Sequence, residues 1–486
     1  MVIQTLIDAL KDHGVLSSFR GDASLSVGNL CYDSRQANGE SLFICKGFGF
    51  RPEFLTGAVE KGAPIYMSET DYPDQPASAI IVNDVRKGMA VASLLFYQHA
   101  YRAFKTVGIT GTKGKTTTTY FVKNILDRFA GKKTAVLSTV EVYTGKTAEQ
   151  AHLTTPEAPD LHRFFAETKE SEIPFLTMEV SSQGYKMSRV YGMTFDVGVF
   201  LNLDEDHISE IEHPDFEDYL SCKLELFRNC RIAVMNRQAR EFERFYEVAK
   251  NHCEKVYTYG VTGEEDYWSE NVRHENGSLI FDLCTKEGRE EYRINVLGRF
   301  NVENALAAAA VCKALGVDRD TIRAGLERTT VEGRMNVFEK NGVTVIVDYA
   351  HNFLSFSRLY ESLKQDFPGR RLVPVFGCPG GKAYLRRRDL GVLSGQNADF
   401  VYLTAEDPQF EDVTTICEEI AEYLKPYHTP YTIIPDRKEA VVRSITEAKP
   451  GDVVILLGKS EELYQKVRGV YEDYESDLIL AEQLMK

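Results

Sequence analysis

Residues 107–121 read VGITGTKGKTTTTYF, an apolar segment that runs into a glycine-rich turn and then into a helical pattern. A strand that feeds a helix through glycines places backbone N–H groups and the positive end of the helix dipole together, where they bind phosphate. The usual spacing is G-x-x-x-x-G-K-[ST], but here Ile109 stands in place of the first glycine. We therefore predict a nucleotide-binding parallel α/β domain with an atypical loop. The alternative is a turn rich in glycine and threonine that has no function.

Apolar strands alternate with amphipathic helices from residue 103 onward, which predicts parallel sheets. Residues 1–100 instead contain short strands between Gly, Pro and Asp turns, and residues 279–297 predict a β-hairpin. We expect an α/β protein of three domains. These are a small N-terminal α/β domain (1–100), a central phosphate-loop domain with a parallel sheet and the added hairpin (101–333), and a C-terminal Rossmann-like, doubly wound domain (334–486).

The composition excludes several classes of protein. A formal charge of −15 argues against a nucleic-acid or anionic-membrane partner, each of which requires a basic face. The N-terminus lacks the basic region of a signal peptide, and no run of about 18–20 apolar residues could span a bilayer. The nine cysteines include no C-x-x-C pair, which favours a reducing compartment. We expect a cytoplasmic protein that binds anionic ligands through local clusters of cations.

Polar side chains follow the apolar strands, and open α/β sheets bind ligands beyond the carboxyl ends of their strands. The residues at these ends are Thr110, Glu179, Asn202, Asp348, Asp407 and Lys459. In the phosphate loop, Lys115 would reach the β- and γ-phosphates and Thr116 would bind Mg²⁺. Glu179, with Asp206 and His207 from the segment NLDEDHIS, offers the carboxylate and imidazole ligands of a hard cation. Alternatively, Glu179 caps a helix.

A lysine shares the apolar face of the helix predicted over HPDFEDYLSCKLELFRN. Lys223 falls on the same face as Phe216, Leu220 and Phe227. A buried lysine readily loses its proton, and the neutral amine reacts with CO₂ to give a carbamate that binds metal. Helical periodicity alone favours the simpler interpretation, in which Lys223 extends from the edge of the stripe to solvent.

Two other segments suit nucleotide or anion binding. Asn301 and Asn304 lie one helical turn apart, where their amides would read an adenine edge or act only as caps. VDYAHN places Asp348 and His351 at a strand end. GGKAYLRRRDLG concentrates basic residues after another strand and is either an anion site or a solvated run of charge.

Taken together, these motifs resemble the Mur ligases, and among them the MurE type that adds the third residue of the peptidoglycan stem peptide. The segments that carry the resemblance are TGTKGKTT, LTTPEAPDL, MEVSSQ, FLNLDEDHI, CKLELF, GRFNVENALAA, EGRM, DYAHN and GKSEE. They occur in the order of the family and cover nearly the whole chain. The glycine spacing of the family's own loop is the one seen here.

The resemblance implies a role for each matching residue. ATP contacts are expected from Gly111, Thr112, Lys113, Gly114, Lys115, Thr116, Thr117, Asn301, Arg334 and Asp348. Mg²⁺ ligands are expected from Thr116, Glu179, His207 and Lys223, the last as a carbamate, and Lys115, Lys223, His207 and Glu179 form the expected catalytic group. The UDP-muramoyl-dipeptide is expected to bind Ser34, Arg35, Thr154, Thr155, Ser181, Gln183 and Arg189. The resemblance thus favours the carbamate interpretation of Lys223.

The implied reaction is ATP-dependent activation of a carboxylate. The terminal D-glutamate of UDP-N-acetylmuramoyl-L-alanyl-D-glutamate would attack the γ-phosphate, and an incoming amine would displace phosphate from the acyl phosphate. Cations are needed because a carboxylate and a triphosphate must meet. We expect a monomer. The alternatives are a folylpolyglutamate or cyanophycin type of ligase and, from another class, a phosphate-loop ATPase that acts as a switch.

The amino acid to be added is predicted from the segment EDPQ, residues 406–409. Relatives that add meso-diaminopimelate carry Asp-Asn-Pro-Arg there, and without the arginine a distal carboxylate has no partner. Acids suit a cationic tail, and Glu411 and Asp412 follow closely. L-Lysine is predicted, with ornithine and meso-diaminopimelate as alternatives, unless the acids form a solvated loop. The residues expected to hold the amino acid are Arg387, Glu406, Asp407, Gln409 and Glu462.

Three positions depart from the family pattern. Phe353 occupies the position of the family's usual proline after DYAHN. In the last motif, GKSEE, Ser460 and Glu461 replace the family's Gly and His. These changes fit a branch with a different third residue.

Overall fold

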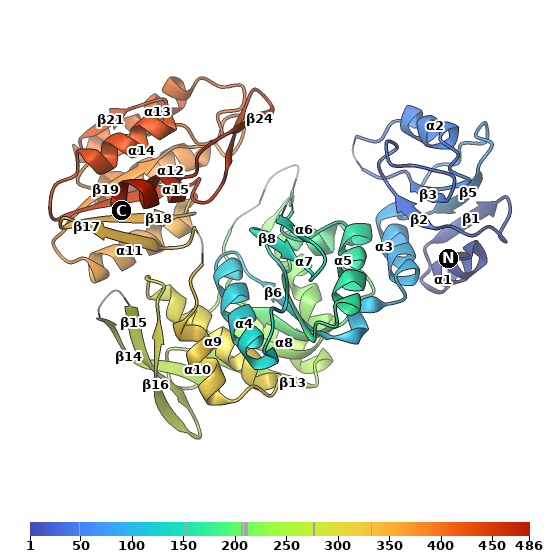
Figure 1. The fold of residues 1–486 in the computed structure, drawn as a ribbon, viewed down its shortest axis with the longest axis horizontal. Helices are drawn as coiled ribbons and strands as arrows, with labels where there is room; N and C mark the ends of the chain where they lie inside the picture. The colour runs from blue at the N-terminus through green and yellow to red at the C-terminus, as the bar shows by residue number, and fades with distance from the viewer. Residues whose placement is uncertain (48, 152, 206–207, 209–211, 276–277, 332) are drawn as a thin grey trace. The chain divides into compact units, whose positions relative to one another are not determined.

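The computed structural model describes residues 1–486 apart from 48, 152, 206–207, 209–211, 276–277 and 332. Its internal contacts divide the chain into two compact units, Met1–Tyr259 with Ala307–Ile322 and Gly260–Leu306 with Arg323–Lys486. Each unit contains parallel strands covered by helices (Figure 1), which confirms the predicted α/β class. No helix in the described part of the chain is long and apolar enough to cross a bilayer.

The N-terminal sheet has the order β1-β5-β4-β3-β2 and is parallel except between β1 and β5. Its strands are Leu16–Arg20, Ser78–Val82, Ile65–Ser68, Ser41–Ile44 and Asn29–Cys31, in that order. Side chains alternate across the sheet. Leu42 and Ile65 pack with α1 (Ile3–Asp12) and α3 (Val85–Phe96), whereas Phe43 and Tyr66 pack with α2 (Pro52–Glu60).

The central sheet of the first unit has the order β13-β12-β11-β6-β10-β7-β8-β9. It is parallel from β13 to β7, and β8 and β9 are antiparallel additions. The strands are β6 (Lys105–Thr110), β7 (Ala135–Leu137), β8 (Glu141–Tyr143), β9 (Ala148–Gln150), β10 (Phe175–Glu179), β11 (Phe195–Phe200), β12 (Cys230–Asn236) and β13 (Lys255–Gly260).

The helices of this sheet position the phosphate loop. Apolar residues of α5 (Ala158–Glu170), α7 (Phe216–Arg228) and α8 (Phe242–His252) form one core with the sheet. Val107 and Ile109 are fully buried outside that core, on the side where α4 (Lys115–Ala130) packs against β6. A short helix, α6 (Ser182–Lys186), follows β10.

The second unit begins with three antiparallel strands, β14 (Tyr267–Glu275), β15 (Ser278–Thr285) and β16 (Gly288–Ile294). The β15–β16 pair confirms the predicted hairpin, and β14 is an additional strand. Two helices follow in the chain, α9 (Phe300–Ala314) and α10 (Arg319–Glu327), and their residues from Ala307 to Ile322 belong to the first unit.

The C-terminal sheet has the order β17-β18-β22-β19-β20-β21 and is parallel except for β17. Its strands are β17 (Asn336–Lys340), β18 (Val343–Asp348), β19 (Arg371–Phe376), β20 (Val401–Leu403), β21 (Tyr431–Ile433) and β22 (Asp452–Leu457). The helices are α11 (Phe353–Asp366), α12 (Leu385–Asn397), α13 (Val413–Glu422), α14 (Arg437–Thr446) and α15 (Asp477–Met485), and a hairpin joins β23 (Tyr464–Val467) to β24 (Val470–Asp473).

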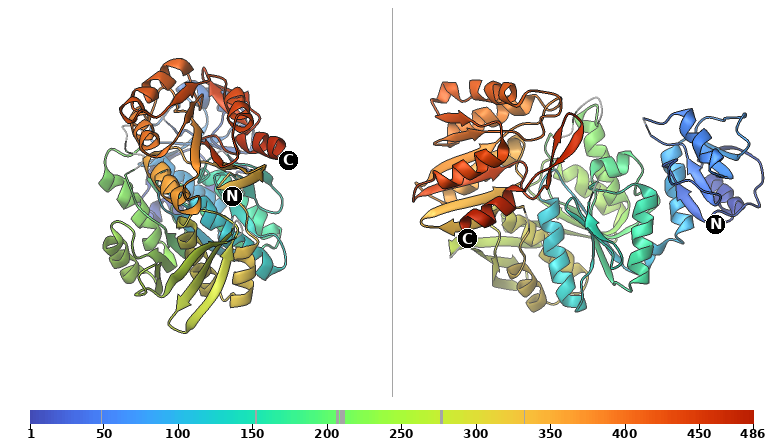
Figure 2. Two further views of the ribbon diagram at one scale, coloured as in Figure 1. Left: turned by 90° about the vertical axis from the view of Figure 1, so that its left-hand side faces the viewer. Right: turned by 45° about the horizontal axis from the view of Figure 1, so that its top comes forward.

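Helices cover both faces of the C-terminal sheet (Figure 2). Val375 belongs to a core with residues of α14 and α15, while the neighbouring Phe376 packs against Phe356 of α11. Each of the three sheets of parallel strands lies within one of the three predicted segments, whereas the compact units divide the chain after Tyr259. The division into three domains therefore stays a prediction.

Candidate active site

The glycines of the phosphate loop have different tasks. Gly114 precedes α4 with φ at +86°, a conformation that side chains rarely adopt. A Cβ at Gly111 would lie 2.9 Å from the Cβ of Leu201, so a larger residue would displace the loop. Gly108 lies inside β6, where a Cβ would be 3.0 Å from the ring of Phe195. Gly111 and Gly114 therefore shape the loop, and Gly108 serves packing.

Side chains from the end of β11 and from α7 hold the loop in place. The Asn202 amide accepts a hydrogen bond from Lys113 N at 2.8 Å and donates one to Lys113 O at 3.0 Å. The Thr112 hydroxyl lies 3.0 Å from the Tyr219 hydroxyl and accepts from Asp204 N at 3.0 Å. A loop fixed in this way needs little rearrangement to bind phosphate.

Two lysines converge on a single carbonyl oxygen in this loop. Lys115 Nζ donates to Gly111 O at 2.8 Å, and Lys223 Nζ donates to the same atom at 3.1 Å. Lys223 is only 2% exposed, and its ammonium lies 4.6 Å from the centre of the Tyr219 ring. The lysine is buried and does not extend to solvent, so the simpler interpretation of its place in the stripe was wrong.

Glu179, the last residue of β10, faces the loop. Its carboxylate accepts hydrogen bonds from Thr116 Oγ1 at 2.9 Å and from the Thr139 backbone and hydroxyl at 3.0 Å each. It is not a helix cap, because Ser181 caps α6. Hydroxyl and carboxylate oxygens are the ligands that Mg²⁺ prefers, so Thr116 and Glu179 fit that ion. Asp206 and His207 lie outside the described residues.

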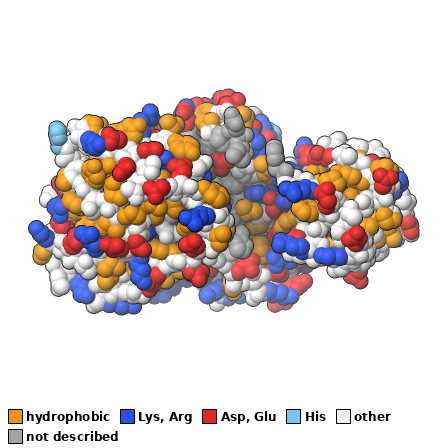
Figure 3. Space-filling model, turned by 90° about the horizontal axis from the view of Figure 1, so that it is seen from above, with side chains coloured by type: hydrophobic (Ala, Val, Ile, Leu, Met, Phe, Trp, Pro, Cys, Tyr) orange, Lys and Arg blue, Asp and Glu red, His pale blue; other side chains and the backbone are white. Residues whose placement is uncertain are grey.

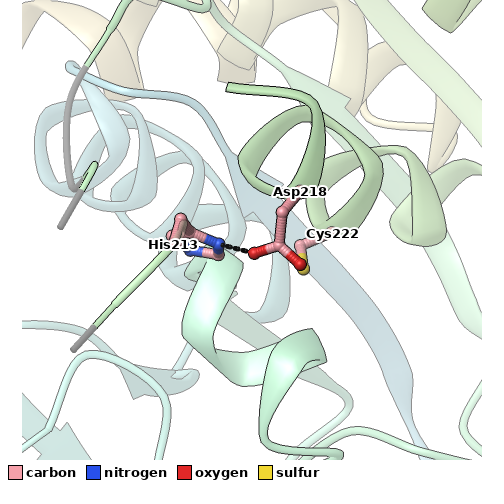
Figure 4. Close-up of side chains that lie close together, drawn as sticks. All are labelled: His213, Asp218 and Cys222. Carbon is pink, nitrogen blue, oxygen red and sulfur yellow. Dashed lines mark hydrogen bonds and ion pairs between the residues drawn. The ribbon is translucent and has the colours of Figure 1, made fainter. Parts of the chain in front are cut away.

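A second histidine connects α7 to the segment after Glu179. The ring of His213 is fully buried, with Nδ1 2.6 Å from Asp218 Oδ2 (Figure 4). Its Nε2 lies 2.9 Å from Ser182 Oγ. Cys222 lies one turn further along α7, and His213, Asp218 and Cys222 form a cluster that could hold a metal ion. Asp218 is already paired with Lys186 at 2.5 Å, so we interpret the cluster as a hydrogen-bonded link. Sequence reasoning missed it because the three elements meet only in the fold.

The residues expected at the muramoyl-dipeptide gather around Thr155. Its hydroxyl accepts from Ser181 N at 3.0 Å, and its carbonyl accepts from Arg189 Nη1 at 3.0 Å. Arg189 also pairs with Glu157 at 3.0 Å, and Lys46, which follows β3, pairs with the other oxygen of Glu157 at 2.9 Å. Burial alone would raise the pKa of Glu157, but Arg189 and Lys46 lower it below its ordinary value. Lys46 and Glu157 were not predicted.

Four other residues are expected to bind the muramoyl-dipeptide, and within the described part of the chain their side chains form no hydrogen bond with the group around Thr155. Thr154 Oγ1 accepts from Thr139 Oγ1 at 3.4 Å, whereas the buried Nε2 atom of Gln183 has no hydrogen-bond partner among the described residues. Arg35 pairs with Asp33 at 2.7 Å and is 88% exposed, and Ser34 O accepts from Lys61 Nζ at 2.9 Å. Gln183 therefore offers an amide donor to a ligand.

The expected nucleotide contacts of the second unit form two buried groups. Asn301 Nδ2 donates to Leu297 O at 2.6 Å, and Asn304 Nδ2 donates to Asn301 Oδ1 at 2.8 Å. Arg334 pairs with Glu461 at 3.2 Å and lies 4.5 Å from the Tyr349 ring centre. The Asp348 carboxylate accepts from Met335 N at 3.0 Å and Ala350 N at 2.8 Å, and burial raises its pKa.

An acid cluster, Glu406, Asp407 and Glu462, lies beyond the ends of β20 and β22. Lys459 Nζ, itself buried, pairs with Asp407 at 2.9 Å and with Glu462, and Glu462 accepts from Tyr349 OH at 2.8 Å. Burial, aided by the charge of Asp407, raises the pKa of Glu406 to about 7, although Arg386 opposes this rise. The cluster therefore already binds one alkylammonium group, that of the chain's own lysine.

The basic and acidic side chains near this cluster are paired with one another or cap a helix. Arg387 is 3% exposed and pairs with Glu411 at 2.7 Å and Glu419 at 2.6 Å, so the basic run is not simply solvated. The Asp412 side chain caps α13 by accepting from Thr415 N. Glu411 and Asp412 thus have partners within the chain, and their part in attracting a cationic tail stays a prediction. Gln409 N donates to Lys466 O at 3.0 Å and anchors the loop to the β23–β24 hairpin.

Comparison with known families places this geometry among ligases. Residues 109–312 match the Mur ligase middle domain, and residues 333–460 match the Mur ligase glutamate ligase domain. A UDP-N-acetylmuramoyl-L-alanyl-D-glutamate--L-lysine ligase of Enterococcus faecalis is 41% identical over 481 residues, which cover 97% of this chain and 93% of that protein. A UDP-N-acetylmuramyl-tripeptide synthetase of Lactobacillus delbrueckii subsp. bulgaricus is 37% identical over 509 residues, which cover 100% and 98%.

Solved structures show the same fold. A UDP-N-acetylmuramoyl-L-alanyl-D-glutamate--2,6-diaminopimelate ligase superposes with a TM-score of 0.69 at 24% identity, covering 100% of this chain and 98% of that chain.

Proposed function

Because the chain belongs to the Mur ligase family, whose members are ATP-dependent ligases that form peptide bonds, we propose that it adds L-lysine to UDP-N-acetylmuramoyl-L-alanyl-D-glutamate in peptidoglycan biosynthesis. The observation that carries the choice of lysine is the acid cluster. It binds the ammonium of Lys459 and, through Glu406, offers a further carboxylate to a second ammonium. The similar ligase of Enterococcus faecalis, which its name describes as an L-lysine ligase, supports the same choice.

The proposed reaction begins at the phosphate loop. An oxygen of the substrate carboxylate attacks the γ-phosphorus of ATP, ADP leaves, and an acyl phosphate remains. The amine of lysine then attacks the acyl carbon, and phosphate departs with the oxygen that came from the carboxylate. Lys115 and the backbone N–H groups of the loop would offset the negative charge that accumulates where the two anions meet.

Mg²⁺ would be held by Thr116, Glu179, His207 and carbamylated Lys223, and when bound it supplies positive charge that lowers the repulsion between the reacting anions. Two observations support the carbamate. Lys223 is buried, which favours a neutral, reactive amine, and it shares an acceptor with the cationic Lys115. Conversion of Lys223 to an anion would replace repulsion between the two side chains with attraction.

Glu406 is our choice for the residue that binds the side-chain ammonium of the incoming lysine. Asp407 and Glu462 share one ammonium, that of Lys459, whereas the carboxyl of Glu406 is held at a high pKa by burial and gains most from a cation. Arg387 remains our proposal for the amino-acid carboxylate, although it would have to exchange Glu411 or Glu419 for that ligand. Gln409 would support the same loop.

The experiment that tests the function supplies purified protein with ATP, Mg²⁺ and the UDP-muramoyl-dipeptide, followed by single amino acids. We expect phosphate release that requires both the dipeptide and an amino acid, with L-lysine the best, and a product heavier by one lysyl residue. Release with meso-diaminopimelate but not with lysine would overturn the specificity. ATP hydrolysis without any acceptor would favour a phosphate-loop switch. We propose that a single chain performs the reaction in the cytoplasm, where ATP is available.

A further inference from the structure

A fully buried ion pair lies beneath the acid cluster. Arg437 is the first residue of α14 and Asp477 the first of α15, and the side chains of both are 0% exposed. Arg437 Nε donates to Asp477 Oδ1 at 3.0 Å, and Nη2 donates to Oδ2 at 2.6 Å. Removing two charges from water is costly, and a buried pair contributes little net stability. Its bidentate geometry fixes position instead.

The remaining donors of Arg437 bind two loops of the proposed amine site. Nη1 donates to Ala405 O at 2.9 Å, directly before Glu406. Nη2 donates to Leu457 O at 2.7 Å, at the end of β22 and two residues before Lys459. Strand β19 lies between β20 and β22, so these two loops do not come from neighbouring strands. One guanidinium therefore links two segments that share no strand pairing, in addition to the pair between Lys459 and Asp407.

Asp477 extends the same contacts to the second loop. Its Oδ2 accepts from Ser460 N at 3.2 Å, and its Oδ1 accepts from Tyr474 OH at 2.7 Å. Ser460 has φ at +50°, a left-handed conformation that costs energy for a residue with a side chain. Such a conformation persists only where the surroundings impose it. Here two hydrogen bonds do so: Ser460 N donates to the Asp477 carboxylate, and Ser460 Oγ donates to Gly333 O at 2.7 Å.

We propose that Arg437 and Asp477 are positioning residues that set the distance between the Glu406–Asp407 loop and the Lys459–Glu462 loop, and thereby the length of the amine side chain that is accepted. The inference rests on the proposed function, since it explains how the amine site distinguishes lysine from ornithine, which is one methylene shorter. Neither residue needs to touch the substrate. If the two loops move apart, the carboxylates that they carry no longer select an amino acid with one particular length of side chain.

The test compares three variants with the wild type. Asp477→Asn removes the charge with little change of shape, the double variant Arg437→Met/Asp477→Leu removes both charges and leaves neither unpaired, and Tyr474→Phe deletes one hydrogen bond. Arg443→Met is the matched control, because Arg443 lies on the same helix but is exposed and, among the described residues, forms ion pairs with Glu439 and Glu447. The readout is the ratio of kcat/KM for lysine to kcat/KM for ornithine, with KM for ATP measured alongside.

We expect the ratio to fall roughly tenfold in the double variant, which is the scale of discrimination for one methylene. It should fall less in Asp477→Asn and Tyr474→Phe and should not change in Arg443→Met. A merely structural role would lower the amount of active protein for both amines and leave the ratio unchanged. If the double variant folds and the lysine-to-ornithine ratio of kcat/KM is unchanged both in it and in Asp477→Asn, the inference is overturned.

Hydrogen exchange separates this inference from the proposed function. Amides of residues 405–407 and 458–462 should exchange faster in the double variant than in Arg443→Met, whichever amine the enzyme uses. If the wild type ligates no amine, the proposed function fails, and equal exchange in the two variants would overturn the positioning role by itself.

Discussion

Lys223 and Lys115 donate to the same carbonyl oxygen, and this contact is the clearest sign of unusual chemistry at a single residue. We predict that Lys223→Ala lowers kcat by roughly 100-fold or more, because the proposed carbamate would no longer supply a metal ligand and its negative charge. Short-chain carboxylates such as acetate or propionate should restore part of the activity by occupying the vacated space. Phosphate release measured with and without the added acid checks this.

The matched control is Lys123→Ala, which removes another buried lysine, one that pairs with Asp127 at 2.7 Å on α4. Carboxylates should not improve that variant. Full activity of Lys223→Ala without any additive would remove the carbamate from the proposal.

Glu406 gives the amine site a pH dependence. Burial raises the pKa of its carboxyl to about 7, above the ordinary 4.5, so the group is ionised above that pH and protonated below it. Only the anion attracts an ammonium, and we predict that KM for lysine rises as pH falls below 7, approaching about tenfold per unit. Steady-state kinetics across the range, with KM for ATP as the reference, measure this. Glu406→Gln should raise KM and flatten its dependence, and an unchanged slope in that variant would assign the titration elsewhere.

At the scale of a single element, helix α5 carries a histidine without polar partners. His162 is fully buried between Tyr101 and Phe165, and neither ring nitrogen has a hydrogen-bond partner among the described residues. Burial lowers its pKa from 6.5 to about 3. Between these values the unfolded chain takes up a proton that the folded chain does not, so the free energy of unfolding falls as pH falls, by up to about 1.4 kcal/mol per unit.

We predict that His162→Phe removes this slope and raises the free energy of unfolding near neutral pH by roughly 1–2 kcal/mol, because two unsatisfied polar atoms disappear. Urea unfolding at several pH values between the two pKa values measures both effects. Parallel pH profiles for wild type and variant would contradict the assignment.

The elements that sequence patterns predict well are those with strong local signals. Strands such as β6, β10 and β18 are apolar runs that end in polar residues, and Thr110, Glu179 and Asp348 lie at their ends as expected because parallel strands finish at one edge. Strand β9 was missed because all of its residues are exposed and carry no apolar pattern. Strand β14 was missed for a similar reason, as more than half of it faces solvent.

The parts of the site that could not be predicted depend on contacts between residues far apart in the sequence. Lys459 pairs with Asp407 across 52 positions, and Lys46, which follows β3, pairs with the distant Glu157. Asp412 resembled a ligand-binding acid in sequence, although an acid directly before a helix is equally typical of a cap. Residue types and strand ends therefore predict where chemistry occurs, and only the fold shows which charges are already paired.

At the scale of the whole molecule, the two compact units carry complementary groups. The phosphate loop, Glu179 and Lys223 belong to the first unit, and the acid cluster with its Arg437–Asp477 pair belongs to the second. Cationic and anionic side chains are interspersed over the face shown in Figure 3, in agreement with a chain whose charged ligands are bound at particular sites and not by a broad patch of one sign. The proposed ligase requires both sets of groups in one chain.

The most direct test follows the oxygen atoms of the substrate carboxylate. UDP-N-acetylmuramoyl-L-alanyl-D-glutamate with ¹⁸O in the terminal carboxylate is incubated with the protein, ATP, Mg²⁺ and L-lysine, and the released phosphate and the product are weighed by mass spectrometry. An acyl phosphate predicts one ¹⁸O atom in each phosphate formed and one lysyl residue in each product, in equal amounts. Unlabelled phosphate, or phosphate formed without lysyl product, would contradict a lysine-adding ligase.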